Sequence, residues 1–211
     1  MPVLAEVERE ALACTRCPLH KGRTTVVFGV GNPTADLMFV GEGPGEQEDR
    51  EGEPFVGRSG RFLDRLVSEE MGMTRADFYI ANVVKCRPPN NRDPLPAEIE
   101  ACRPFLSAQV ELVAPTVIVT LGNFATKLLL GTTDGITRLR GRSYLAAGRT
   151  LVPTFHPAAV LRGGGEPEAQ MRADLVRAKK LLIAPRPVAG PGPGGTAGRE
   201  ATVVTAPRLL G

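Results

Sequence analysis

The sequence predicts an α/β fold in which a four-stranded parallel sheet carries helices on both faces. Four short apolar runs, at residues 36–41, 78–84, 116–121 and 150–155, alternate with longer segments of helical periodicity. Strands that alternate with helices form parallel sheets, and strands buried on both faces are apolar along most of their length. Glycines or polar residues follow these runs, at the edge where such sheets bind ligands.

The predicted helices carry apolar residues at three- and four-residue spacing, which is the pattern of a helix with one buried face. Gly72 and Gly131 are expected to end two of them. Residues 19–34 are expected to be a loop or short irregular strands, residues 132–149 a polar region, and the run from Leu161 to Gly165 a loop. The helices are predicted at residues 2–13, 59–72, 96–113, 123–130 and 167–182.

The 211 residues fit one domain at residues 1–184 followed by a tail at residues 185–211. Hydrophobic residues make up 42% of the chain, which is enough to fill a core. The tail has 11 glycines or prolines among its 27 residues and no repeat, so we expect it to be disordered. Val203-Val204 and Leu209-Leu210 leave open a weak interaction with a protein partner.

The charge and hydropathy patterns narrow the range of partners. The chain has no apolar run of about 18 residues, and its first residues lack the apolar core of a signal peptide, so we expect no membrane association and a cytoplasmic location. We also expect a monomer. The net charge is +3, of which the tail supplies +2, so a nucleic-acid partner has to bind local basic patches.

A glycine-rich turn after the first predicted strand is the stretch around which the chain is organised. The apolar residues 37–40 lead into Gly41-Glu42-Gly43-Pro44-Gly45, and several acidic residues follow. Glycines allow the backbone to approach a bound group closely. The turn has neither the G-K-[ST] of a P-loop nor the G-x-G-x-x-G spacing, so nucleotide binding is a weak interpretation. An ordinary solvated loop is the alternative that the glycines alone leave open.

The four cysteines form the second informative pattern. Cys14 and Cys17 have C-x2-C spacing at the end of the first helix, Cys86 follows the second strand, and Cys102 lies in the next helix. In a cytosolic protein such a pair indicates metal or redox chemistry rather than a disulfide. Four thiolates suit either zinc or an iron–sulfur cluster, and the spacing does not decide between them. Four unrelated buried cysteines are the remaining alternative.

Four motifs together resemble one known family. They are GEGPGEQED at residues 41–49, PFVGRSG at 54–60, NVVKCRPPNNR at 82–92 and HPAAVLR at 156–162. With the four cysteines, they make residues 10–182 similar to the family 4 uracil-DNA glycosylases. The resemblance implies an αβα sandwich around a four-stranded parallel sheet. It also implies a [4Fe–4S] cluster held by Cys14, Cys17, Cys86 and Cys102.

The activity implied by this resemblance is the excision of uracil from single- or double-stranded DNA during base excision repair. The enzyme hydrolyses the bond between uracil and deoxyribose and leaves an abasic site. The resemblance assigns uracil contacts to Gly41, Glu42, Gly43, Phe55, Asn82 and His156. Phe55 is expected to stack on the flipped base, Asn82 to read its pairing edge, and His156 to stabilise the departing uracil anion at O2.

The group that activates the attacking water has to be sought among nearby carboxylates. Family 1 enzymes have an aspartate in the motif GQDPYH where this chain has Gly43, so that general base is missing here. Glu42 and Glu48 are the candidates that join His156 as catalytic residues. Glu48 is also a candidate for excluding thymine, because Gly45 replaces the family 1 tyrosine that blocks the methyl group.

Contacts with the DNA backbone are expected from local basic residues, since phosphate contacts position a protein without reading sequence. Leu161 is a candidate wedge that enters the duplex. Solvated surface charge is the alternative for any one of the basic side chains. The predicted DNA contacts are Lys85, Arg140, Leu161 and Arg162.

Two other function classes compete with the glycosylase interpretation. An iron–sulfur redox or DNA-sensing module without catalysis would use the same cysteines and leave no abasic product. An α/β hydrolase that does not act on nucleic acid is disfavoured, because the chain has no G-x-S-x-G motif.

Overall fold

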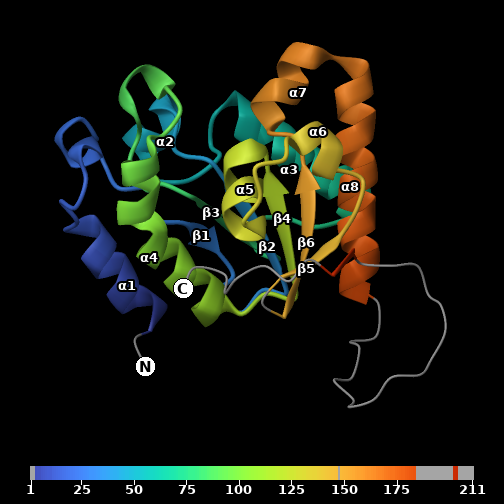
Figure 1. Cartoon of the computed structure of the whole chain (residues 1–211), viewed down its shortest axis with the longest axis horizontal. Coiled ribbons are helices and arrows are strands. Elements are labelled where there is room, and N and C mark those ends of the chain that lie inside the picture. The colour runs from blue at the N-terminus through green and yellow to red at the C-terminus, as the bar shows by residue number, and fades with distance from the viewer. Residues whose placement is uncertain (1–2, 147, 184–201, 204–211) are drawn as a thin grey trace.

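The structure is a computed structural model that describes residues 3–146, 148–183 and 202–203 of the chain. One seven-stranded sheet lies at the centre of these residues, with the strand order β1-β3-β2-β4-β6-β5-β7 (Figure 1). Its four middle strands run parallel to one another. They are β3 (Tyr79–Asn82), β2 (Leu37–Gly41), β4 (Val117–Leu121) and β6 (Arg149–Thr154), so the four predicted strands and the α/β fold are confirmed.

Three short strands extend the sheet beyond the four predicted ones. β1 (Val30–Gly31) pairs antiparallel with β3, and β5 (Tyr144–Ala146) pairs antiparallel with β6. β7 (Thr202–Val203) pairs parallel with β5. β7 belongs to residues 185–211, where we predicted a disordered tail, so at these two residues the structure has a strand instead. The other residues of that range lie outside the described part of the chain.

Alternate side chains of the middle strands pack against helices on opposite faces of the sheet, which gives the three predicted layers. Met38 and Val40 belong to a core shared with residues of α1, α4 and α5, whereas Leu37 and Phe39 belong to a second core shared with α3, α7 and α8. The first group of helices is α1 (Leu4–Leu12), α4 (Pro96–Val113) and α5 (Asn123–Leu130). The second is α3 (Arg58–Met71), α7 (Pro157–Gly163) and α8 (Gly165–Ile183).

The structure contains two short helices that we did not predict from the sequence. α2 (Glu46–Glu51) begins directly after the glycine-rich turn, and its acidic first turn suits the positive end of the helix dipole. α7 covers Leu161 and Arg162, which we expected to lie in a loop. It forms because Pro157 occupies its first position and His156 caps its N-terminus. The remaining short helices are α6 (Ile136–Leu139) and two 3₁₀ turns, Pro18–Lys21 and Pro89–Asn91.

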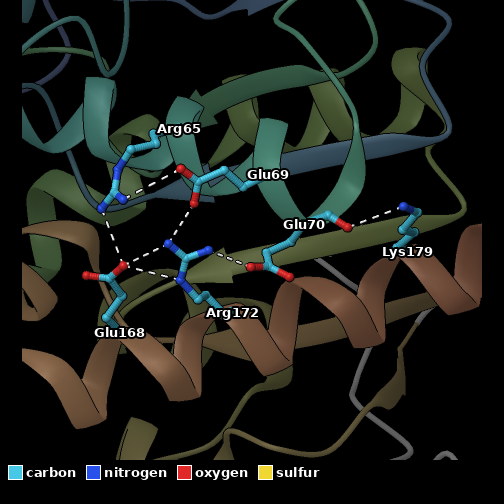
Figure 2. A network of polar contacts seen from close by, with 6 residues as sticks. All are labelled: Arg65, Glu69, Glu70, Glu168, Arg172 and Lys179. Atoms are coloured by element: carbon cyan, nitrogen blue, oxygen red, sulfur yellow. Dashed lines mark hydrogen bonds and ion pairs between the residues drawn. The ribbon is translucent and has the colours of Figure 1, made fainter.

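An ionic network joins α3 to α8 on the outside of the second helix layer. Arg172 of α8 is at its centre and forms ion pairs with Glu69 at 2.6 Å and with Glu168 at 2.9 Å. It also pairs with Glu70 of α3. The network comprises Arg65, Glu69, Glu70, Glu168, Arg172 and Lys179 (Figure 2).

The four parallel strands end at the same edge of the sheet, and this edge positions the candidate site. β2 ends at Gly41, β3 at Asn82, β4 at Leu121 and β6 at Thr154. The glycine-rich turn, the loop with Cys86, the turn at Gly122-Asn123 and the cap of α7 all follow these ends. Among the described residues, no helix has both the length and the apolar character needed to cross a membrane.

Candidate active site

A pocket with a volume of about 530 Å³ lies at this edge of the sheet. Its wall is formed by the turn after β2, the segment before α3, the end of β3, the loop after Cys86 and the start of α7. The glycine-rich turn is therefore part of a concave surface and not an ordinary exposed loop. The predicted site residues that line the pocket are Glu42, Gly43, Glu48, Phe55, Asn82, His156 and Arg162.

Gly41 allows two of these side chains to converge. A β-carbon at this position would lie 2.4 Å from Asn82 Oδ1 and 2.5 Å from Phe55 Cζ, so a larger residue would displace both side chains. Gly41 itself is not among the residues that line the pocket. The structure shows a packing role for Gly41 beneath the site, and its contact with uracil stays a prediction.

Asn82 presents an unpaired polar atom at the pocket. Its side chain is only 1% exposed, and its oxygen Oδ1 has no hydrogen-bond partner in the described part of the chain. A buried amide group without a partner costs roughly 1–3 kcal/mol of stability. Such an atom at the wall of a pocket indicates a ligand that donates a hydrogen bond to it.

Phe55 lies beside Asn82 in a strained backbone conformation. Its φ angle is +57°, a left-handed value that is rare for a bulky residue and typical of functional sites. Arg75 stabilises this turn by donating to the carbonyl oxygens of Pro54, at 2.9 Å, and of Phe55. Gly60 is packed so closely that a β-carbon there would lie 1.6 Å from Phe55 O. The ring is thus fixed in place, at a centroid distance of 5.8 Å from the ring of His156.

His156 is held as a neutral hydrogen-bond donor. Its Nδ1 accepts a hydrogen bond from the N–H of Ala158 at 3.2 Å, so the proton of the neutral ring is on Nε2. Burial lowers the pKa of His156 to about 4, and the positive charge of Arg162 adds to this effect while Glu48 opposes it. At neutral pH the side chain therefore offers one N–H group from Nε2.

Glu42 is the carboxylate with the properties of a general base. Burial raises the pKa of Glu42 to about 7, and the negative charge of Asp93 raises it further. Both side chains belong to the wall of the same pocket. A carboxylate that titrates near neutral pH is present in its basic form and still accepts a proton readily.

Glu48, which we predicted as a catalytic candidate, has both carboxylate oxygens bonded to the backbone. One carboxylate oxygen accepts the N–H of Gly45 at 3.1 Å, and the other accepts the N–H of Gly57 at 2.8 Å. Glu48 therefore joins the turn after β2 to the start of α3. Because both oxygens are engaged by the backbone, this geometry favours positioning of the pocket wall over activation of water.

Comparison with known proteins decides the family. The chain matches the model of the uracil DNA glycosylase superfamily over residues 28–178. It belongs to this superfamily.

Curated relatives narrow the match to one branch of the glycosylase superfamily. A type-4 uracil-DNA glycosylase of Sulfurisphaera tokodaii is 41% identical over 194 residues, which covers 88% of each chain. Those of Thermotoga maritima and Archaeoglobus fulgidus are 47% and 45% identical, over 83% and 76% of this chain and 93% and 84% of the relative. The predicted resemblance to the family 4 enzymes is confirmed.

Lys85 is not available to DNA, although we predicted a phosphate contact for it. Its side chain is 1% exposed, and its ammonium donates to Asn82 O at 2.7 Å and to the side-chain oxygen of Gln109. Burial lowers the pKa of Lys85 to about 8. The side chain of Lys85 therefore lies in the protein interior.

Arg140 is also corrected from a predicted DNA contact to an internal one. Its Nε and Nη2 donate to the two carboxylate oxygens of Asp174, each at 3.0 Å, and Asp174 is only 1% exposed. Nη2 also donates to Gln170 O at 2.8 Å. A guanidinium bound in this bidentate manner neutralises a buried carboxylate and is not free to bind a phosphate.

Arg162 and Leu161 were both predicted to contact DNA, and they differ in solvent exposure. Arg162 is exposed and lines the pocket. Leu161 is half-buried and packs against the second core, so only part of its side chain is accessible to a duplex.

Arg58 is a pocket residue that sequence reasoning missed, although it lies in the motif PFVGRSG. Asp93, directly after NVVKCRPPNNR, was missed as well.

The four cysteines lie around one small cavity. All four are free thiols, and those of Cys86 and Cys102 are buried. No three potential ligands among the described residues are close enough to hold a single metal ion. A [4Fe–4S] cluster needs less convergence, because four thiolates surround a group of several irons instead of one atom. Four thiolates that line one cavity are a donor set that suits such a cluster.

Donors beside the sulfur atoms also fit a negatively charged cluster. Arg23 donates to Cys86 Sγ at 3.3 Å, Arg16 donates to Cys14 Sγ at 3.4 Å, and the N–H of Lys85 donates to Cys102 Sγ at 3.2 Å. Hydrogen bonds to sulfur are a usual means of stabilising such clusters. Burial raises the pKa of Cys102 to about 11, so its free thiol is protonated at neutral pH and metal binding releases that proton.

Proposed function

We propose that this chain is a uracil-DNA glycosylase that hydrolyses the N-glycosidic bond of deoxyuridine in DNA and leaves an abasic site. Its family membership supports this reaction class. The observation that carries the proposal is the buried, unpaired oxygen of Asn82 in a pocket that also contains Phe55 and His156. A base reaches such a pocket only after it has been flipped out of the stack.

Uracil recognition is proposed to rest on the amide of Asn82. Uracil presents an N3–H donor next to the acceptor O4, so N3–H donates to Oδ1 and the amide nitrogen donates to O4. Cytosine has an acceptor at N3 and an amino donor at position 4, and both contacts would be mismatched. The ring of Phe55 supplies the apolar plane on which the flipped base stacks.

His156 is proposed to stabilise the leaving group. When the bond between C1′ and N1 breaks, its electron pair passes to uracil and negative charge collects at O2. The N–H at Nε2 of His156 donates to this oxygen, and its orientation is fixed before the reaction by the bond from Ala158 to Nδ1. Because its pKa is low, His156 acts as a neutral hydrogen-bond donor.

Glu42 is proposed to accept the proton of the attacking water. The water oxygen forms a bond to C1′ as uracil departs, and one water proton passes to the carboxylate. Glu42 lines the pocket, and its side chain has no hydrogen-bond partner among the described residues, so it is free to bind the water. Glu48 supports the same step indirectly by holding the turn that carries Glu42.

Phosphate contacts around the flipped nucleotide are proposed for Arg58 and Arg162. Both are exposed, both line the pocket, and neither side chain has a hydrogen bond or ion pair in the described part of the chain. Such contacts position DNA without reading its sequence, so they serve single- and double-stranded substrates alike.

The cysteine site is proposed to hold a [4Fe–4S] cluster on Cys14, Cys17, Cys86 and Cys102. When bound, the cluster supplies covalent links between the segment after α1, the loop after β3 and helix α4, and its binding energy becomes folding energy. Cysteines that serve as metal ligands and not as disulfides are typical of a reducing compartment, for which we propose the cytoplasm. One chain contributes every group used here, so we propose that the monomer is active.

The proposal is tested with an end-labelled oligonucleotide that contains one uracil, incubated with the purified protein and then treated with alkali to break abasic sites. We expect strand breakage at uracil and none in a matched oligonucleotide with cytosine at the same position. Asn82→Ala should remove most of the activity, whereas Arg172→Ala, in the α3–α8 network, serves as a matched surface control. Cluster-loaded wild-type protein that leaves the uracil strand intact would refute the proposal and favour a non-catalytic role.

A further inference from the structure

Lys85 carries a side-chain ammonium group in the protein interior, where a charged group is rarely found without a structural reason. It follows Asn82 by three residues and directly precedes Cys86, so it lies between the base-reading strand and the cysteine site. Removing an ammonium group from water is unfavourable unless hydrogen bonds replace those of the solvent. The contacts of Lys85 therefore show what it holds together.

The ammonium of Lys85 binds the strand end that carries Asn82. Its Nζ donates to Asn82 O at 2.7 Å and to the side-chain oxygen of Gln109, and the Phe28 ring faces it at 5.8 Å. Gln109 in turn donates from Nε2 to Phe28 O at 2.8 Å and to the hydroxyl of Tyr79 at 3.2 Å. These hydrogen bonds join the main chain of Asn82, through Lys85 and Gln109, to the main chain of Phe28 and to helix α4.

The main chain of Lys85 binds the helix that carries a cysteine. Its N–H donates to Cys102 Sγ at 3.2 Å, and its carbonyl oxygen accepts the N–H of Val27 at 2.8 Å. Cys102 and Gln109 are both on α4, and their spacing of two helical turns places them on the same face. Lys85 therefore contacts α4 at Cys102 and at Gln109, and it also contacts Asn82, the residue proposed to read the base.

We propose that Lys85 is a positioning residue for uracil recognition, because it holds the end of β3, and with it the amide of Asn82, against the cysteine-bearing helix α4. This inference rests on the proposed role of Asn82 in uracil recognition. The cysteine site then affects base recognition as well as stability. When α4 moves, Lys85 moves with it, and the position of the Asn82 amide changes. Lys85 does not touch the substrate, so its effect must pass through Asn82.

Lys85→Met is the direct test, because methionine has a similar length, removes the ammonium and keeps the main-chain N–H to Cys102. The holoprotein variant is compared with wild type for binding of DNA that contains a non-cleavable 2′-fluorinated deoxyuridine or the matched cytidine, measured by fluorescence anisotropy. We expect the preference for uracil over cytosine to fall about tenfold, in the range of coupling between contacting residues. Iron content and visible absorbance should stay at the wild-type level.

A double-mutant cycle separates positioning from a general loss of stability. We expect Lys85→Met to slow single-turnover excision about tenfold in the wild-type background and less than twofold in the Asn82→Ala background. Val67→Ala, on the buried face of α3 in the other helix layer, lowers stability without disturbing α4 and should leave the base preference unchanged. Equal slowing by Lys85→Met in both backgrounds, or an unchanged base preference, would overturn the inference.

The outcomes remain informative when Lys85→Met does not yield folded protein. Gln109→Met removes the other acceptor of the ammonium without touching Asn82, and it should weaken the uracil preference by a smaller factor. An unchanged preference in that variant counts against the inference. A wild-type protein that does not prefer uracil refutes the proposed function itself, whereas a preference that these variants leave intact refutes only the role of Lys85.

Discussion

The pH dependence of uracil excision tests the proposed base most directly. Glu42 has a pKa of about 7, raised by burial and by Asp93, whereas His156 has a pKa of about 4 and stays neutral across the useful range. Only the ionised form of Glu42 accepts a proton from water. With this pKa the ionised fraction rises from about one tenth at pH 6 to about nine tenths at pH 8. We therefore expect the single-turnover rate to rise about tenfold over these two pH units.

The perturbation that distinguishes Glu42 from other groups is Asp93→Asn. It removes the second cause of the raised pKa and leaves the larger cause, burial, in place. The pKa of Glu42 then falls, so the rise in rate should begin at a lower pH and the variant should be faster than wild type at pH 6. Glu42→Gln should be slow at every pH and lack the rise.

The assay is single-turnover excision from a uracil oligonucleotide with protein in saturating excess, quenched in alkali, from pH 5.5 to pH 9. Saturation removes any effect of charge on DNA affinity from the observed rate. A cytosine oligonucleotide corrects for background breakage at each pH. A flat profile in wild type, or a profile for Asp93→Asn that coincides with that of wild type, would refute the assignment of Glu42 as the base.

Four other changes separate recognition, leaving-group stabilisation, cluster binding and helix packing. His156→Ala should slow single-turnover excision about 10²–10³-fold with little change in affinity for abasic DNA; an unchanged rate would leave His156 as a cap of α7 only. Asn82→Asp should lose most uracil activity and gain weak cytosine activity at low pH, where a protonated carboxyl donates to N3; excision of uracil at the wild-type rate contradicts the proposed readout. Cys102→Ala should lose visible absorbance and iron and melt at a lower temperature, whereas colourless wild-type protein with stoichiometric zinc contradicts a cluster. Arg172→Ala should lower the free energy of unfolding by about 1 kcal/mol, less at high salt, and leave excision unchanged; no change in the melting temperature would make the network neutral.

Sequence patterns predicted the elements whose formation depends on local periodicity. The apolar runs located all four parallel strands, and a polar residue inside one of them singled out Asn82. Short irregular strands were expected within residues 19–34, but the positions and pairing of β1 and β5 were beyond this reasoning, because two or three residues carry no period and pair only when a neighbouring strand is present. The strained φ angle of Phe55 was beyond it for a similar reason, since Arg75 and Gly60 impose it from other segments.

Long-range contacts explain the two errors at predicted DNA contacts. Lys85 stands in a basic segment that is typical of a surface loop, but its partners Phe28 and Gln109 are distant in sequence. Arg140 stands in an arginine-rich segment, and its partner Asp174 lies on α8. Charge in a local window indicates exposure on average, and only the tertiary fold reveals which cation has a buried acceptor.

These two internally bonded cations hold strand ends at the same edge of the sheet. Lys85 binds the carbonyl of Asn82 at the end of β3. Arg140 binds Asp174, and that carboxylate also accepts the hydroxyl of Thr154 at 2.9 Å and the N–H of Gly141 at 3.1 Å. Thr154 is the last residue of β6 and the second before His156. Lys85 thus contacts the main chain of Asn82 directly, whereas Arg140 reaches Thr154, two residues before His156, through Asp174. Both cations are bound to internal acceptors beside residues proposed to bind uracil, whereas the exposed Arg58 and Arg162 line the pocket and are the arginines proposed to contact phosphate.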